Sequence, residues 1–361
     1  MKQFCLSALL TLCAAQFSFA QNQDKSLSIP DLDQYKTLKC DFHMHTVFSD
    51  GLVWPTVRVD EAYAEGLDAI AITEHIEYRP HKEINASHNR SYEIAKKQAD
   101  QLGVILIKGS EITRNMAPGH NNAIFLQDCD KLDTPDYMDA FKAAKTQNAF
   151  IFWNHPGWDA QQPEVTRWWD IHTKLYEGGF MQGIEVANGV NYYPEAHQWC
   201  IDKKLTMMGT SDIHQPIQTD IDFSKGEHRT MTLVFAKERT AESIKEALLN
   251  RRTAVFFKDK VIGEEVYLKD LFKNAVKIEK INKTDKSVQI TIYNNSDLTF
   301  TLKKNEHDPE LNYFRDYTIK PKTHYTFVTY VHRPTIEGAI TFEVTNLLVA
   351  PGKGLSYSWE F

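Results

Sequence analysis

The most informative residues of this sequence are histidines and carboxylates that follow short apolar runs. Five or six of these runs each end in a side chain that can bind a metal ion. In chain order these side chains are His43, His45, Asp50, His75, Glu111, His120, His155, Asp212 and His214. Any one of them could be an ordinary hydrogen-bonded polar residue. Their repeated place after apolar runs is hard to explain in that way.

The chemistry of this set is that of a mixed nitrogen and oxygen ligand sphere. His43 and His45 are two residues apart, so in a strand their imidazoles point to the same side and can reach one ion. The set contains no sulfur, which favours Zn²⁺, Mn²⁺ or Fe²⁺ over Cu(I) or an iron–sulfur cluster. A carboxylate such as Glu111 can bridge two ions, and paired ions about 3.5–4 Å apart are typical of phosphoryl displacement by an activated water.

The elements that must position these side chains are predicted from hydrophobic patterning. Apolar runs occur at 67–72, 104–107, 149–153 and 183–186. Helical patterns occupy 91–102, 134–146 and 240–252. Short continuous apolar runs are typical of strands buried on both faces, as in parallel sheets, and their alternation with helices predicts an α/β fold. In strand–helix barrels the site forms at the carboxyl ends of the strands.

The pattern changes after about Ile262, where apolar residues begin to alternate with polar ones. This period of two is seen at 288–292, 300–302, 325–330, 340–344 and 355–361. It predicts a small antiparallel β-sandwich. We therefore expect a linker at 21–38, a barrel domain at 39–260 and a C-terminal β-sandwich at 261–361.

The first twenty residues have the pattern of a signal peptide. Lys2 precedes an apolar stretch from Phe4 to Phe17, and small residues surround position 20. The stretch is too short to span a bilayer. We expect export to the periplasm or the extracellular space. Lipid attachment at Cys13 is less favoured, because the bulky Leu12 precedes it.

Composition narrows the classes of partner. The net charge is −7, with 25% charged and 42% hydrophobic residues, as in ordinary soluble proteins. No basic excess points to nucleic acid, whereas a small anionic substrate stays possible because bound metals add local positive charge. Beyond residue 20 the cysteines are Cys40, Cys129 and Cys200, too few and too widely spaced for a disulfide framework or a thiolate zinc site. Nothing in the sequence indicates the oligomeric state.

Taken in order, the metal-binding motifs resemble those of the polymerase-and-histidinol-phosphatase (PHP) superfamily. The motifs are His43-Met-His45-Thr, Ser49-Asp50-Gly51, Thr73-Glu-His75, Glu111, His120, Asn154-His155-Pro156 and Asp212-Ile-His214. They fill all nine ligand positions between about residues 39 and 257. The resemblance implies a distorted (β/α)7 barrel of PHP type and a centre of two or three divalent ions.

The resemblance also implies how the ligands divide among the ions. The first ion would be bound by His43, His45, Glu111 and Asp212. The second would share Glu111 and also be bound by His120 and His155. The third would be bound by Asp50, His75 and His214. Some family members have a histidine at the position of Asp50, so the identity of the metal stays open.

The predicted signal peptide and β unit resemble the secreted Sb-PDE-like phosphodiesterases of the superfamily. This layout implies hydrolysis of small phosphodiesters by a hydroxide that bridges the ions, with Glu111, Asp212 and His214 in the catalytic centre. A phosphomonoesterase of histidinol-phosphatase type is the alternative enzyme. A binding module stabilised by metal but inactive is the alternative of another class, although no ligand position is missing.

Residues outside the ligand set are candidates for substrate binding and for support. Arg114 and Arg229 follow ligand-bearing segments and could bind a phosphoryl oxyanion, or equally form salt bridges. Glu185 and Asn188 lie at a predicted strand end and are expected to support the ligands. Trp158 is a candidate for lining a pocket, although packing is the commoner role of a tryptophan.

Overall fold

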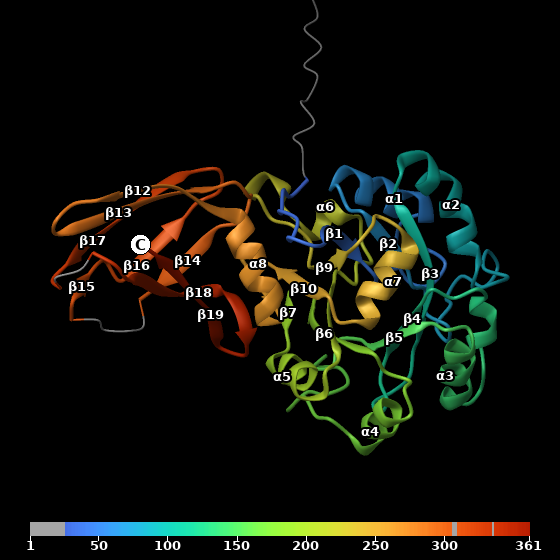
Figure 1. Cartoon of the computed structure of the whole chain (residues 1–361). Coiled ribbons are helices and arrows are strands. Elements are labelled where there is room, and N and C mark those ends of the chain that lie inside the picture. Colours follow the sequence, from blue (N-terminus) through green and yellow to red (C-terminus); the bar gives the residue numbers. More distant parts are fainter. Residues whose placement is uncertain (1–25, 305–308, 334–335) are drawn as a thin grey trace, which may run out of the picture.

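The computed structural model describes residues 26–304, 309–333 and 336–361. The predicted signal peptide, with Cys13, lies outside the described residues. Figure 1 shows two units side by side, a larger one with helices around its strands and a smaller one made mostly of strands. Among the described helices, none has the length and apolar character needed to cross a bilayer.

The larger unit contains eleven strands among its described residues. They are β1 (Lys36–Asp41), β2 (Ala69–Ile72), β3 (Ile105–Ile112), β4 (Asn121–Ile124), β5 (Phe150–Trp153), β6 (Gly183–Asn188), β7 (Asn191–Tyr192), β8 (Thr206–Thr210), β9 (Met231–Ala236), β10 (Thr253–Phe257) and β11 (Lys260–Gly263). Every residue of β2, β5, β6, β8, β9 and β10 is buried. Continuous apolar runs therefore mark strands covered on both faces, as the sequence predicted.

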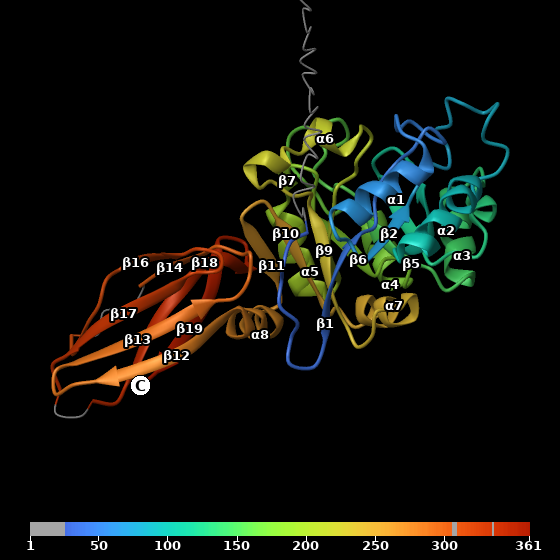
Figure 2. The same ribbon diagram turned by 90° about the horizontal axis from the view of Figure 1, so that it is seen from above.

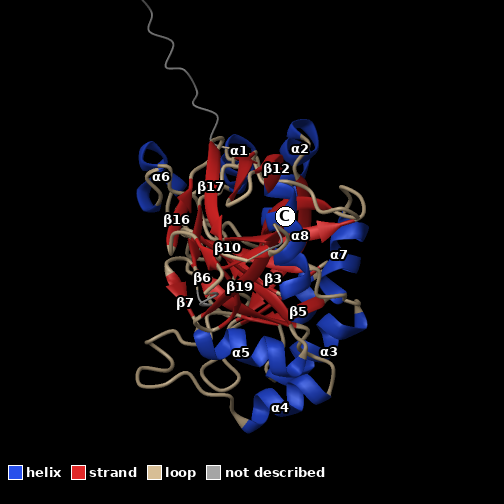
Figure 3. Cartoon of the chain, turned by 60° about the vertical axis from the view of Figure 1, so that its left-hand side comes forward, coloured by secondary structure: helices blue, strands red, loops and turns tan. Residues whose placement is uncertain are grey.

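Helices cover the outside of these strands (Figure 3). They are α1 (Pro55–Ala64), α2 (Arg90–Leu102), α3 (Tyr137–Thr146), α4 (Asp170–Glu177), α5 (Pro194–Lys203), α6 (Ile217–Asp220) and α7 (Ala241–Leu249), with short 3₁₀ turns at Cys129–Leu132 and Phe223–Lys225. The helix predicted at 134–146 begins later, because Asp136 caps it by accepting a hydrogen bond from the Met138 amide. Thr240 caps α7 in the same way.

The sheet of the larger unit is mixed, so the expectation from parallel sheets holds only in part. β1, β2 and β3 are parallel, as are β5, β6 and β8. β4 is antiparallel to both β3 and β5, and β9 is antiparallel to β1 and β10. No helix separates β3 from β4, and a short connection without a crossover reverses the chain.

The barrel closes through threonine hydroxyls between β8 and the β9–β10 pair. The Thr232 hydroxyl accepts from the Gly209 amide at 3.0 Å and donates to the Gly209 carbonyl at 2.8 Å. The Thr253 hydroxyl donates to the Met207 carbonyl at 2.9 Å. A Cβ on Gly209 would lie 2.3 Å from a methyl carbon of Val255, so only glycine allows this approach. No strand pairing joins β8 to β9 or β10 among the described residues, so these side-chain hydrogen bonds connect the strands here.

The smaller unit is a sandwich of two antiparallel sheets. Its strands are β12 (Val276–Lys283), β13 (Ser287–Asn294), β14 (Phe300–Lys303), β15 (Leu311–Asn312), β16 (Asp316–Ile319), β17 (His324–Val331), β18 (Ala339–Ala350) and β19 (Lys353–Glu360). One sheet has the order β12-β13-β17-β15, and the other contains β16, β14, β18 and β19. Phe327, Phe342 and Trp359 meet between them. The predicted period of two is confirmed by the alternating burial of β13 and β18.

The two units share one sheet and one hydrophobic core. β18 of the sandwich pairs in parallel with β11 of the barrel, with Val261 opposite Leu347 and Ile262 opposite Leu348. Helix α8 (Glu265–Ala275) lies at the junction (Figure 2). The predicted border at 260/261 therefore falls at the start of a strand that joins the units.

We expect the two units to unfold together, because they share this strand pair. Leu347→Ala would remove a fully buried side chain from the junction, at a cost of roughly 2–5 kcal/mol in the free energy of unfolding. Differential scanning calorimetry should show one transition in the wild type and one, at lower temperature, in the variant. Two separate transitions, of which only one shifts, would contradict the shared core.

Candidate metal centre

Two ligand-bearing segments lie side by side at the carboxyl ends of β1 and β8. The Asp212 amide donates to the His43 carbonyl at 2.9 Å, and the His45 amide donates to the Ile213 carbonyl at 3.0 Å. This pairing fixes the spacing between the His-x-His and Asp-x-His motifs. Asp212 has a φ of +51°, a strained conformation for a residue other than glycine and one that is common at functional sites.

The mixed sheet brings the other ligands to the same edge. Glu111 lies near the end of β3, and His155 follows β5. His120 precedes β4, but β4 runs antiparallel to its neighbours, so its start lies at the edge where β3 and β5 end. The reversal of one strand thus places His120 beside ligands that follow parallel strands.

The first cluster is formed by His43, His45, Asp212 and Glu111. Nε2 of His43 and Nε2 of His45 lie 3.1 and 3.2 Å from the same Asp212 oxygen, Oδ1. The Glu111 Oε2 atom lies 3.6 and 3.4 Å from these two nitrogens. These four side chains are the set that the family resemblance implies for one ion.

Glu111 lies between this cluster and a second one. Its other oxygen, Oε1, lies 2.9 Å from Nδ1 of His120 and 3.7 Å from Nε2 of His155. One carboxylate therefore directs its two oxygens to different histidines, those of the first cluster and the pair His120 and His155. This is the placement expected of a bridging ligand.

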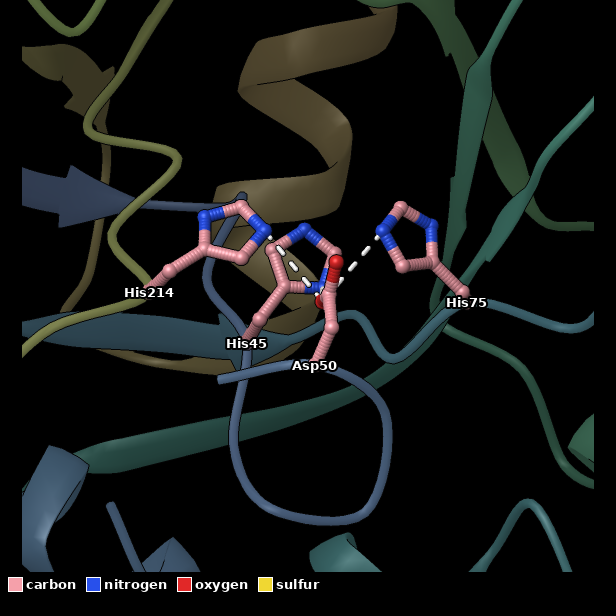
Figure 4. Close-up of side chains that lie close together, drawn as sticks. All are labelled: His45, Asp50, His75 and His214. Atoms are coloured by element: carbon pink, nitrogen blue, oxygen red, sulfur yellow. Dashed lines mark ion pairs between the residues drawn. The ribbon is translucent and has the colours of Figure 1, made fainter. Parts of the chain in front are cut away.

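The third cluster is built on Asp50, as Figure 4 shows. Its Oδ1 atom lies 3.4 Å from Nε2 of His75 and 3.3 Å from Nε2 of His214. Nδ1 of His75 lies 2.7 Å from Glu111 Oε2, so His75 faces Glu111 as well as Asp50. That contact with the bridging carboxylate is a feature that the resemblance does not include.

The hydrogen bonding of these residues tests whether they fit metal ions. Five of the nine have a buried side-chain nitrogen or oxygen without a hydrogen bond, namely Asp50 Oδ1, Glu111 Oε2, His120 Nδ1, His155 Nδ1 and Asp212 Oδ1. Four of these atoms, all except Nδ1 of His155, lie within 3.4 Å of another member of the set. Five such atoms at one site fit a place where cations complete the bonding, and their nitrogen and oxygen donors suit Zn²⁺, Mn²⁺ or Fe²⁺.

The electrostatics of the centre favour cations. Burial alone would raise the pKa of Glu111, but His75, His120 and His43 outweigh it and hold the pKa well below its usual value. Burial is the main cause, and the neighbouring His75 the second, of a lowered pKa of about 3 for His45. Glu111 is therefore ionised and His45 neutral near pH 7, which are the protonation states that metal ligands require.

Glu185 orients two of the histidines. The buried carboxylate of Glu185 accepts from Nδ1 of His43 at 2.8 Å, which leaves Nε2 of that ring free for an ion. It also accepts from the backbone amide of His155 at 2.6 Å and from the Asn188 side chain at 2.8 Å. Glu185 and Asn188 thus occupy the supporting positions that the sequence suggested.

The two arginines proposed for substrate binding are committed to other groups. Arg229 is fully buried, and its guanidinium donates to Asp41 at 2.9 Å and to both oxygens of Glu65. Arg114 pairs with Glu77 at 2.8 Å and donates to backbone carbonyls of the 134–135 segment. For Arg229 this differs from the expected contact with a phosphoryl group, because Asp41 and Glu65 occupy its buried donors. For Arg114 such a contact stays a prediction.

Arg229 has a supporting place in the site. Its partner Asp41 accepts from the amide of Ser211 at 3.1 Å and from the Ser211 hydroxyl at 2.5 Å. Ser211 immediately precedes the ligand Asp212. The buried ion pair thus holds the strained segment that carries this ligand.

A second buried arginine, Arg58 of α1, was not predicted from the sequence. It donates to the carbonyls of His45 at 2.9 Å and Ile213 at 3.1 Å, and it pairs with Glu61 at 2.7 Å. It therefore joins the same two ligand-bearing segments as the Arg229–Asp41 pair. The only signal in the sequence is the three-residue spacing of Arg58 and Glu61, which is also common on solvated helices.

Trp158 lies at the outer side of the second cluster. Its ring centre is 5.6 Å from that of His120 and 5.2 Å from that of His155, and the residue is 43% exposed. The predicted place beside a pocket therefore corresponds to direct contact with two metal-ligand candidates. Trp158 shields these rings from solvent on one side.

Comparison with known proteins agrees with this centre. A two-domain protein from Bacteroides vulgatus ATCC 8482, which contains a predicted PHP-like metal-dependent phosphoesterase, is 61% identical in sequence. The match covers 93% of this chain and 98% of that one, with a TM-score of 0.91. An Ig-like domain family matches residues 274–360. An uncharacterized protein of Methanocaldococcus jannaschii is 40% identical over 76 residues, and the chain covers only 34% of that relative.

The chain belongs to the PHP-like metal-dependent phosphoesterases. The fold expected from the resemblance, a PHP-type barrel followed by a small β-sandwich, is confirmed by the likeness to the Bacteroides vulgatus structure and by the Ig-like match. The class of activity is hydrolysis of a phosphate ester with the help of metal ions.

The geometry ranks the ligands by the number of clusters they touch. Glu111 contacts histidines of all three clusters, whereas Asp50 contacts chiefly the third. We expect Glu111→Ala to lose more bound metal per chain than Asp50→Ala, because it removes a ligand from at least two ions. Elemental analysis of both purified variants would measure this. Equal loss in the two variants would contradict the bridging position of Glu111.

Proposed function

We propose that this phosphoesterase hydrolyses small phosphodiesters with two or three divalent ions, either Zn²⁺, Mn²⁺ or Fe²⁺. The observation that carries the proposal is the position of Glu111, whose two oxygens face different groups of histidines. Bound ions would supply a Lewis acid for the phosphoryl oxygens and a water acidic enough to react near neutral pH. The nine nitrogen and oxygen ligands would hold these ions.

The side chains around the centre define what the protein itself contributes. Glu185 keeps His43 in the tautomer whose Nε2 atom faces the cluster, and Asn188 supports Glu185. The Arg58 and Arg229 ion pairs hold the segments that carry His45 and Asp212. These contacts keep the ligands in place before substrate binds, which is the role of preorganisation in catalysis.

The pairing of the nearby arginines with carboxylates supports a diester as substrate. A monoester dianion needs more fixed positive charge than a diester monoanion, and a bidentate arginine is the usual source. Among the described residues, Arg79, Arg114 and Arg229, the candidates near the ligand loops, are each paired with a carboxylate. The ions would then supply most of the charge that offsets the substrate.

Two further parts of the proposal rest on sequence features. We propose export to the periplasm or the extracellular space, based on residues 1–20. The layout also supports a place in the Sb-PDE-like secreted phosphodiesterases. A phosphomonoesterase is the alternative activity. An inactive binding module would be expected to lack ligands, and all nine are present.

Removal of metal should abolish activity and lower the melting temperature, because bound ions stabilise the folded state that holds them. The protein would be treated with a chelator, dialysed, and assayed for hydrolysis and thermal unfolding before and after each metal is restored. Full turnover by protein shown to be metal-free by elemental analysis would refute the proposed function.

A diester should be the better substrate. We expect bis(4-nitrophenyl) phosphate to be hydrolysed with a higher kcat/KM than 4-nitrophenyl phosphate at the same pH and metal loading. A tenfold preference corresponds to only about 1.4 kcal/mol in transition-state binding, so the comparison needs matched enzyme preparations. A preference for the monoester would replace the diesterase proposal by the phosphatase alternative.

A further inference from the structure

A large cleft lies between the barrel and the β-sandwich, and Asp212 is the one of the nine ligand candidates that lines it. Its volume is about 1380 Å³, larger than the roughly 300–1,000 Å³ of most small-molecule sites. On the barrel side its lining includes Asn188, Ser211 and Asp212. Asp212 faces His43 and His45, so the cleft reaches a residue of the first metal cluster.

The opposite wall of the cleft comes from the β-sandwich. Residues 297–300, before and at the start of β14, and Asn346 and Leu347 of β18 line this side. The pairing of Leu347 with Val261 and the shared core hold the two walls in fixed relation. The sandwich is therefore built into the surroundings of the active centre.

The charges in the cleft indicate what it would accept. Its lining includes five carboxylates and one lysine, namely Asp212, Asp220, Glu227, Asp259, Asp297 and Lys258. Arg229 also borders the cleft, but Asp41 and Glu65 offset its charge. Burial lowers the pKa of His228, which is then neutral near pH 7. Lysines beside Asp259 and Asp297 reduce the negative charge without reversing it, so the lining disfavours a polyanion.

We propose that this cleft receives the organic group of the ester, and that this group is a polar alcohol that carries a positive charge. The inference rests on the proposed phosphodiesterase function. A phosphoryl group with one small substituent would occupy only a small part of 1380 Å³. Residues of the β-sandwich then contribute to substrate selection while the barrel holds the metals.

Two diesters with the same leaving group test the proposal. Methyl 4-nitrophenyl phosphate and 4-nitrophenyl phosphorylcholine both release 4-nitrophenol, so their difference reports the group that remains. We expect the metal-loaded full-length protein to hydrolyse the choline ester with at least a tenfold higher kcat/KM. Equal values would overturn the inference and leave the diesterase function standing. Failure to hydrolyse either ester would overturn the proposed function.

A matched pair of variants locates the effect in the cleft. Thr299 lines the cleft from the sandwich side, whereas Thr318 lies on β16 away from it, and both are exposed. Thr299→Trp should lower kcat/KM for the choline ester about tenfold and leave that for the methyl ester nearly unchanged. Thr318→Trp should change neither. An equal loss on both esters in Thr299→Trp would contradict a role in binding the organic group.

A charge-reversal pair gives an independent test that does not depend on a bulky side chain in the sandwich. Asp220 lines the cleft from α6, and Asp285 is exposed in the β12–β13 turn of the sandwich, outside the cleft. Asp220→Lys should reduce the preference for the choline ester at least threefold, and Asp285→Lys should leave it unchanged. The same preference in wild type and both variants would overturn the proposed role of charge.

Discussion

The site depends on the burial of one carboxylate among imidazoles. Glu111 is fully buried, touches histidines from several strand ends, and has an oxygen without a hydrogen bond. A buried carboxylate in such a place is tolerated only where positive charge surrounds it. Protonated imidazoles can supply that charge in the absence of metal, and divalent cations supply it more completely. The rest of the centre follows from the need to bring these ligands around Glu111.

The mixed barrel meets that need by bringing loops from distant parts of the chain to one edge. Parallel strands alone would place ligands only after strand ends, whereas the antiparallel β4 adds a ligand, His120, before a strand. The backbone pairing between residues 43–45 and 212–213 then sets the spacing of two motifs more than 160 residues apart in sequence. Two buried arginines stabilise these segments: Arg58 donates to the Ile213 carbonyl, and Arg229 pairs with Asp41.

The parts predicted from the sequence are those governed by local patterns. Apolar runs identified the buried strands, alternation identified the sandwich, and the order of motifs predicted side chains that the structure brings close together. The helix starts were predicted less accurately, because the capping residues Asp136 and Thr240 determine where these helices begin. The direction of β4 and the hydroxyl closure at Gly209 depend on contacts between distant strands, and no local pattern indicates them. The contact between His75 and Glu111 also joins distant parts of the chain and has no local signal in the sequence.

The arginines show why substrate contacts are harder to predict than metal ligands. A metal site needs several ligands, so each motif supports the others, whereas an arginine near a ligand loop has equally good partners in phosphate and in carboxylate. For Arg229 the partner is decided by burial: a guanidinium taken out of water must meet opposite charge, and Asp41 and Glu65 provide it. That pair reaches Asp212 through Ser211. The charge of Arg229 therefore acts on the centre through the position of a ligand, and selection of the substrate falls to the groups that line the cleft.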